Sequence, residues 1–263
     1  MTLKLTATLI PLLVLGSCSI AFFGNEKASR EGTIQHTASS GITNIRIEGF
    51  NGSISVTPAD GGLEVQGQTY TYATAQTQEE AARRLGQMQW NFRESGSTLY
   101  LDLSRPDGGS NNAGGALKHL SIPSAWKVDV DTSNGSVSID PGFATVLVNT
   151  SNGNVDVNSN GKVRIRSSNG SVDLSGRTQD FNVRSSNGSI DVSLEGDWSG
   201  NGNVESSNGK ISLRCSGNLD CTLRTDTSNG KVHVYGPPIE TGEGSLVLDT
   251  SNASISVTHK DKE

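Results

Sequence analysis

A short polar motif, Ser-Asn-Gly preceded by Ser or Thr, recurs along the second half of this 263-residue chain. From Asn134 onward the motif asparagines are 18, 17, 18, 21, 21 and 23 residues apart, and an isolated Asn51-Gly52 precedes them. Near-constant spacing of this kind indicates one supersecondary unit copied many times. We expect a structural turn ladder of eight asparagines: Asn51, Asn134, Asn152, Asn169, Asn187, Asn208, Asn229 and Asn252.

Apolar residues keep a fixed place relative to each motif asparagine, which is numbered n. Positions n−6, n−4, n+3 and n+5 are Val, Ile, Leu or Phe in 30 of 32 cases, and only Gly202 and Thr225 depart. The positions between them are mostly polar. Strict alternation rich in β-branched residues is typical of half-buried strands. The pattern therefore predicts an all-β fold in which each repeat holds two short strands joined at Ser-Asn-Gly.

Two architectures are compatible with such a repeat. Asn-Gly is a strong hairpin signal, because both residues tolerate the positive φ of a tight turn, and this favours an antiparallel meander. In a hairpin, however, the inward n−6 residue would lack a consistent apolar partner at n+7. In a solenoid each strand pairs with its equivalent in the next coil, and the coils share one core. We predict a parallel β-solenoid of about eight coils with Ser-Asn-Gly corners and keep the meander as the alternative.

The repeat is interrupted over residues 58–126. Within this excursion Thr77 and Glu80 have the spacing of a capping box, which predicts one short helix that ends near Trp90. We interpret the excursion as a cap over the first coil, and a ligand-binding excursion is the alternative. Regular repeats are expected over residues 127–258, followed by a tail at residues 259–263.

The N-terminus has the pattern of an export signal. An apolar run over residues 9–15 is too short to span a bilayer but suits a signal peptide. Leu15-Gly16-Ser17-Cys18 resembles a bacterial lipobox. This resemblance implies a lipoprotein signal peptide over residues 1–17, a lipid on Cys18 and a lipid-anchored tether over residues 18–41, with an ordinary signal peptide as the alternative. The expected partner is then a membrane, and the expected location is the bacterial cell envelope, periplasmic or at the cell surface.

Lipidation of Cys18 would leave two cysteines in the mature chain. Cys215 and Cys221 are six residues apart, and this spacing could close a small disulfide loop in an oxidising compartment. Two free thiols are the alternative, because the geometry of the pair cannot be read from sequence.

The charged residues indicate no catalytic or nucleic-acid chemistry. The net charge is −6 without basic runs, and the four histidines lack a metal-ligand spacing. We therefore predict no nucleic-acid partner, no cofactor, no metal and no catalytic residue. Asp156, Asp173 and Asp191 share position n+4 and would form a row. We interpret this row as a solvated face offset by neighbours such as Arg164 and Arg184, with a bound cation or basic ligand as the alternative.

The ordered series of motifs resembles the bacterial putative adhesin domain family over residues 42–258. The resemblance rests on the run Asn51-Gly52-Ser53-Ile54-Ser55-Val56, the helical excursion after it, Ser121-Ile122-Pro123, and the repeated Thr-Ser-Asn-Gly-Ser-Val-Ser-Ile. It implies a β-solenoid fold in an envelope domain of unknown function, and it supplies no catalytic residues.

Two functions from different classes remain open. The first is a non-enzymatic cell-envelope lipoprotein whose adhesin-like solenoid has a binding or scaffold role toward an unknown protein or glycan. The second is a polysaccharide-active β-helix enzyme, a lyase or hydrolase, which would need clustered acids and aromatic sugar platforms. Trp90, Trp126 and Trp198 are far apart in the sequence and the acids are dispersed, which favours the first.

Overall fold

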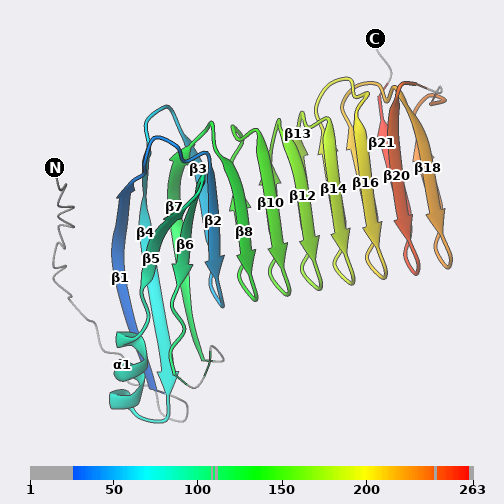
Figure 1. Ribbon diagram of the computed structural model, residues 1–263. Helices are drawn as coiled ribbons and strands as arrows, with labels where there is room; N and C mark the ends of the chain where they lie inside the picture. Colours follow the sequence, from blue (N-terminus) through cyan, green and yellow to red (C-terminus); the bar gives the residue numbers. More distant parts are fainter. Residues whose placement is uncertain (1–25, 108, 110–111, 240–241, 261–263) are drawn as a thin grey trace.

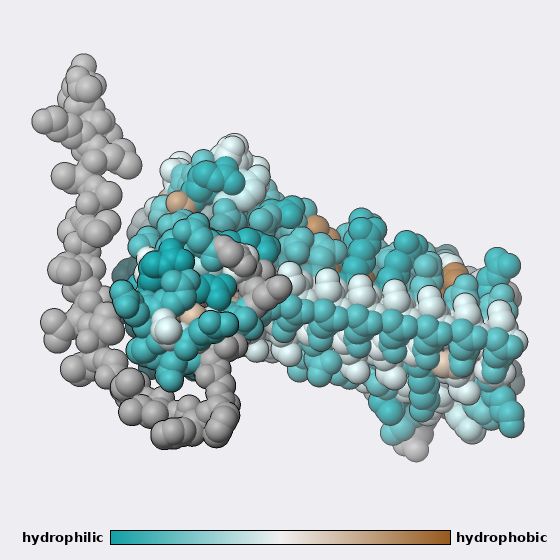
Figure 2. All heavy atoms as spheres, turned by 90° about the horizontal axis from the view of Figure 1, so that it is seen from below, coloured by the Kyte–Doolittle hydropathy of each residue, from teal (hydrophilic) through white to brown (hydrophobic). Residues whose placement is uncertain are grey.

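The computed structural model describes residues 26–107, 109, 112–239 and 242–260. Its strands form two long sheets that give the solenoid the shape of a rod (Figures 1 and 2). The first sheet has 11 strands, in the spatial order β1 (Glu26–Thr37), β4 (Glu64–Ala75), β7 (Ala113–Pro123), β3 (Ile54–Ala59), β9 (Val137–Ile139), β11 (Val155–Asn158), β13 (Val172–Gly176), β15 (Ile190–Leu194), β17 (Ile211–Cys215), β21 (Ile255–His259) and β19 (Val232–Tyr235).

The second sheet has 10 strands. Their spatial order is β18 (Cys221–Thr227), β20 (Gly244–Thr250), β16 (Asn201–Ser206), β14 (Asp180–Ser185), β12 (Lys162–Ser167), β10 (Thr145–Thr150), β8 (Lys127–Thr132), β2 (Asn44–Gly49), β6 (Thr98–Leu103) and β5 (Trp90–Ser95). One helix, α1 (Gln78–Gly86), lies at the N-terminal end of the rod (Figure 1).

Each repeat forms one coil of the solenoid. A strand of the second sheet leads through Ser-Asn-Gly into a strand of the first sheet. Neighbouring coils pair in parallel and in register, so that Val163 lies beside Val146 in the second sheet and Val172 lies beside Val155 in the first. This pairing confirms the predicted β-solenoid and excludes the antiparallel meander for the repeats.

The apolar positions of the repeat point into the space between the two sheets. Apart from the coil of Asn229, every Val, Ile, Leu or Phe at these positions is at most 2% exposed. Gly202 departs from the pattern because a Cβ there would lie 2.4 Å from the ring of Phe181. The other exception, Thr225, belongs to the coil of Asn229 and is half-buried. The core is therefore one continuous column of mainly aliphatic side chains.

The corner glycines are required for a reason that differs from the sequence interpretation. Among the described corner residues only Asn51 has a positive φ, of 51°. A Cβ on Gly170 would instead lie 1.9 Å from the carbonyl oxygen of Gly153 in the preceding coil. A methyl group on this glycine would clash with the preceding coil unless the corner shifts, as it must where the coil of Asn252 carries Ala253 at the same position. The positive-φ explanation is therefore wrong for the regular coils.

The coils do not stack in sequence order. β20 and β21, the last two strands of the chain, insert between the coil of Asn208 and the coil of Asn229. As a result β18 and β19 form the outermost coil, although they come earlier in the sequence (Figure 1).

The excursion over residues 58–126 covers the first coil, as expected. β6 pairs with β2 and β7 pairs with β3, both in parallel, and β5, β4 and β1 add antiparallel strands beyond them. Thr77 caps the helix as predicted, since its hydroxyl accepts a hydrogen bond from the Glu80 N–H at 3.2 Å. The helix ends at Gly86, earlier than predicted, because Trp90 already begins β5.

Two predicted segment boundaries need correction. Residues 26–37 of the expected tether form β1, which pairs with β4 along its whole length. His259, placed in the tail by the sequence analysis, ends β21 and is 5% exposed. The expected signal peptide at residues 1–17 and the expected lipidation site, Cys18, lie outside the described residues. Within the part of the chain that the structure describes, no helix is long and apolar enough to cross a membrane.

Candidate functional site

The outward side chains of the second sheet carry charges that change sign along the rod. β12 presents Arg164 and Arg166, β14 presents Arg184, and the strands β16 and β20 present Glu205 and Asp249. The alternation of a strand fixes this arrangement, because positions n−5 and n−3 face solvent wherever n−6 and n−4 are buried. A basic segment is thereby placed next to an acidic one on a single flat face.

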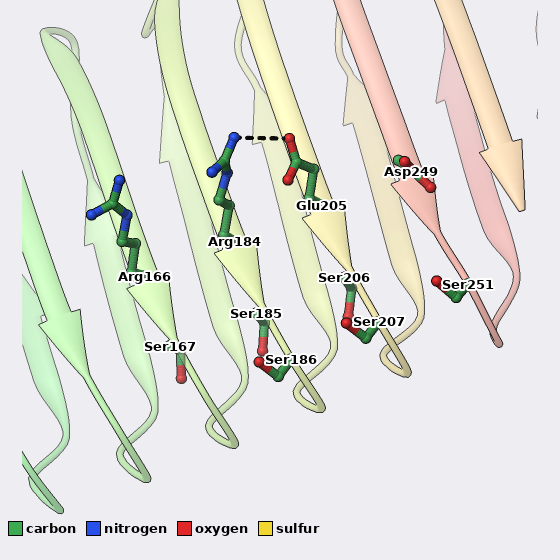
Figure 3. Close-up of a pocket in the computed structure, with 10 residues that line it drawn as sticks. All are labelled: Arg166, Ser167, Arg184, Ser185, Ser186, Glu205, Ser206, Ser207, Asp249 and Ser251. Carbon is green, nitrogen blue, oxygen red and sulfur yellow. Dashed lines mark hydrogen bonds and ion pairs between the residues drawn. The ribbon is translucent and has the colours of Figure 1, made fainter.

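A shallow depression of about 360 Å³ lies where the basic and acidic segments meet, close to the corners. Figure 3 shows its lining, in which the charged side chains stand on the sheet and the serines follow at the strand ends. The lining residues are Arg166, Ser167, Arg184, Ser185, Ser186, Glu205, Ser206, Ser207, Asp249 and Ser251.

Arg166 and Arg184 are the cationic side of this depression. They are direct partners in the register of β12 and β14, so the two side chains leave the sheet from adjacent strands. Arg184 Nη2 donates to Glu205 Oε1 at 3.0 Å, and Asn203 Nδ2 donates to the same oxygen at 2.6 Å. No ion pair of Arg166 is found among the described residues. The charge of Arg166 is therefore not compensated by an ion pair, whereas the charge of the neighbouring Arg184 is paired with Glu205.

The serines of the depression have two different roles. Ser167, Ser185 and Ser206 are buried, and each hydroxyl accepts a hydrogen bond from the corner glycine N–H three residues later, at 2.9–3.1 Å. These three serines stabilise the corner. Ser186 and Ser207 are exposed at the next position, where their hydroxyls can donate to a ligand. Guanidinium groups beside free hydroxyls form a site suited to a carboxylate or another oxyanion.

The predicted asparagine ladder is present and runs the length of the solenoid. Each Asn Nδ2 donates to the Oδ1 of the neighbouring coil's asparagine, at 2.5–2.8 Å for the links from Asn152 onward. Asn134 donates to Asn51 in the same way, and Asn51 Nδ2 ends the series on the carbonyl of Ala113 at 2.8 Å. Figure 2 views these corners and shows a continuous hydrophilic stripe along the rod. The ladder is a structural element, since its side-chain amides bond to one another.

The two described cysteines are buried free thiols in this structure. Burial is the main cause that raises the pKa of Cys215, and burial together with the nearby Cys215 raises the pKa of Cys221 to about 11. The disulfide expected from their spacing stays a prediction.

The predicted acidic row exists on the outer face of the first sheet. Asp156, Asp173 and Asp191 are register partners on β11, β13 and β15. Burial, followed by the charges of Asp191 and Asp156, raises the pKa of Asp173. The neighbouring cation is Arg214, 3.9 Å from Asp191. Arg164 and Arg184, which the sequence analysis offered as neighbours, lie on the other sheet, so that part of the interpretation is wrong. The described residues contain no group of three His, Cys, Asp or Glu placed to hold a metal.

The three tryptophans do not form a sugar platform on the rod. Trp126 and Trp198 are 3% and 1% exposed, and Trp90 is half-buried against the core. The Trp198 indole N–H donates to the carbonyl of Thr178 at 2.8 Å. All three side chains therefore serve packing.

Sequence reasoning did not single out the depression at Arg166 and Arg184. The available signal was that both arginines occupy position n−3 of successive repeats, which a parallel register places side by side.

No protein-family model matches the chain, and no curated protein matches it. Solved structures similar to it include a putative cell adhesion protein from Clostridium sporogenes, at 10% identity over 88% of this chain and 100% of the other, with a TM-score of 0.38. Putative adhesins from Bacteroides fragilis and Parabacteroides merdae are each 11% identical. They cover 87% and 86% of this chain and 96% and 95% of their own, with TM-scores of 0.33 and 0.35. The solenoid assignment itself rests on the strand pairing described above.

Proposed function

We propose that this chain is a non-enzymatic, adhesin-like β-solenoid of the bacterial envelope, which binds an anionic polysaccharide on the outer face of its second sheet. The observation that carries the proposal is the depression in which Arg166, without an ion-pair partner in the described chain, stands beside Arg184. The exposed hydroxyls of Ser186 and Ser207 add hydrogen-bond donors at its edge. A uronate residue offers the carboxylate and the hydroxyl groups that such a lining can bind.

The rod supports this role through its rigidity. The charged side chains stand on parallel strands whose register is fixed by a buried aliphatic core and by the asparagine ladder. Sites on strands hold their geometry more closely than sites on loops, and little ordering cost is then added on binding.

Membrane attachment is the second part of the proposal. The lipobox-like Leu15-Gly16-Ser17-Cys18 would give a mature protein anchored by a lipid on Cys18. In the native host, globomycin should cause the uncleaved precursor to accumulate, and Cys18→Ala should release the protein from the detergent phase. Processing that is insensitive to globomycin would overturn the anchor.

The glycan part is tested with a soluble form comprising residues 26–263. We expect it to bind a polyuronate, such as pectate or alginate, in isothermal titration calorimetry and to bind a neutral glucan at least tenfold more weakly. Arg166→Glu combined with Arg184→Glu should abolish binding. Lys210→Glu, an exposed cation directly before β17 of the first sheet, is the matched control and should retain it. Binding should also weaken as salt is added, because exposed charges are screened.

The polysaccharide-active enzyme remains the second candidate, because Glu205 and Asp249 are register partners within the same depression. Release of new reducing ends or of unsaturated products from the polyuronate by pure protein, lost in Glu205→Gln, would replace the binding role with catalysis. Unchanged binding by the double arginine variant would overturn the proposed site.

A further inference from the structure

The outermost coil of the solenoid, made of β18 and β19, has an open face. In the described chain each of these strands pairs on one side only, with β20 and β21 respectively (Figure 1). Val232 and Val234 of β19 are 39% and 47% exposed, and the following Tyr235 is 55% exposed. The two valines occupy the repeat positions n+3 and n+5, which are at most 2% exposed in the other coils. The open face is thus the same apolar surface that every other coil buries against its neighbour.

The opposite end of the rod is protected. There β6 and β7 cover the first coil, antiparallel strands follow them, and α1 packs against β1 and β4. Unpaired strand edges with apolar side chains are templates for further strand pairing, and proteins usually cover them or place charges on them. The described chain covers the first coil at one end of the rod and leaves the β18–β19 coil uncovered at the other.

The charges on β18 indicate what can cover the open face. Arg224 and Asp226 point outward on either side of the inward Thr225. If a second β18 pairs antiparallel with Thr225 at the centre, Arg224 lies opposite the partner's Asp226, and Asp226 lies opposite the partner's Arg224. Opposite charges directly across an antiparallel pair are favourable, and like charges are unfavourable.

The two-fold rotation that relates the two β18 strands also brings the two β19 strands into an antiparallel pair. Thr225 and His233 are each four residues from the corner Asn229, so one two-fold axis can pass through the centre of both strands. Val232 then meets the partner's Val234, and two apolar faces are buried together. An interface of this kind is isologous and closes after two copies.

We propose that the β18–β19 coil is a self-association surface, through which two copies of this chain join end to end into one continuous solenoid. The covered N-terminal ends then lie at the two far ends of the doubled rod. If Cys18 carries the lipid of the proposed function, the dimer would link two facing membranes. The end-to-end contact itself does not depend on that anchor or on the glycan site.

The test uses charge reversal in the soluble form, residues 26–263. We expect a dimer in light scattering and a maximum dimension near twice that of the monomer in small-angle X-ray scattering. Arg224→Asp alone and Asp226→Arg alone place like charges opposite each other, and each should be monomeric. Mixing these two variants restores both ion pairs and should restore the dimer, as should the double variant R224D/D226R. Lys210→Asp, away from the open face, should leave the dimer unchanged.

Circular dichroism separates dissociation from unfolding in every variant. A monomeric wild-type protein at its highest soluble concentration would overturn the proposal. So would single variants that remain dimeric, or a mixture that stays monomeric while both components are folded. Arg224→Asp should still bind polyuronate, so failure of the end-to-end contact is distinguishable from failure of the glycan site.

Discussion

Asn252 Nδ2 donates a hydrogen bond to Asn208 Oδ1 at 2.7 Å, although 44 residues separate the two asparagines in the sequence. Asn229, which lies between them in the sequence, instead donates to Asn252 at 2.8 Å from the far side. The C-terminal strands β20 and β21 therefore complete an internal coil, and an earlier segment forms the end of the rod.

Removal of the outermost coil should be tolerated, whereas removal of the C-terminal coil should not. Asp220 O lies 3.3 Å from Gly244 N, so residues 221–243 can be excised with these two residues joined directly. Truncation after residue 243 instead removes Leu246, Leu248 and Ile255, all 0% exposed, and each such burial contributes about 1.5–3 kcal/mol. Thermal unfolding should show the excised form within a few degrees of the parent and the truncated form far below it. If the truncated form were the more stable of the two, β20 and β21 would not form an internal coil.

Gly170→Ala should destabilise the solenoid severely. Its new Cβ would lie 1.9 Å from the Gly153 carbonyl oxygen, so the backbone of one of the two stacked coils must shift. We expect a loss of more than ~3 kcal/mol in urea unfolding, above the usual range for overpacking. Gly41→Ala is the control, since nothing lies within 4 Å of its Cβ position. Equal stability of the two variants would show that the corner spacing is looser than described.

An asparagine inside the ladder should matter more than the one at its open end. Asn169 donates to Asn152 and accepts from Asn187, at 2.6 and 2.7 Å, whereas Asn229 makes one ladder bond. At about 0.5–1.5 kcal/mol for each bond, Asn169→Ala should cost about 1–3 kcal/mol. Asn229→Ala should cost about half of that, as measured by urea unfolding of both variants. A larger cost at Asn229 would contradict the order of the ladder.

The stability of the rod should fall as pH rises past the usual range of a carboxyl group, in part because of Asp173. Its pKa is raised in the folded chain by burial and by Asp191 and Asp156, so the folded state binds this proton more tightly than the unfolded state does. Stability is therefore lost between the ordinary Asp pKa of about 3.9 and the raised value. Asp173→Asn should be more stable than the parent at pH 7, and the difference should shrink below about pH 4.

Melting curves recorded from pH 3 to pH 8 would check this expectation. Asp60→Asn, on an exposed turn, serves as the control for a general change in charge. A stability gain at Asp173 that does not depend on pH would assign the effect to packing instead.

The two described cysteines should be unreactive in the folded protein. Both are buried, and the pKa of Cys221 is raised to about 11, so little nucleophilic thiolate exists at pH 8. We expect no reaction with Ellman's reagent in native residues 26–263 and two thiols per chain after unfolding in guanidinium. Absence of thiols until a reductant is added would instead establish the disulfide predicted from their spacing.

Much of the fold could be predicted from the sequence because each repeat is encoded locally. The alternation around Asn169, with Val163 and Ile165 before it and Val172 after it, fixes which side chains point inward. In the structure each of these three side chains is at most 1% exposed. The candidate site at Arg166 and Arg184 was harder to predict. The two arginines are 18 residues apart, and they form a site only through the parallel register of β12 and β14.

The sequence by itself determined the strands, the corners and the apolar column, because β-alternation and the Ser-Asn-Gly motif act within a single coil. The tertiary structure decided the order of the last coils and hence which end of the rod is open. Repeats that are alike can stack in more than one order, so the choice depends on burial summed over whole coils. The coil of Asn252 is aliphatic at all four inward positions, whereas the coil of Asn229 carries Thr225, and the more apolar coil lies inside.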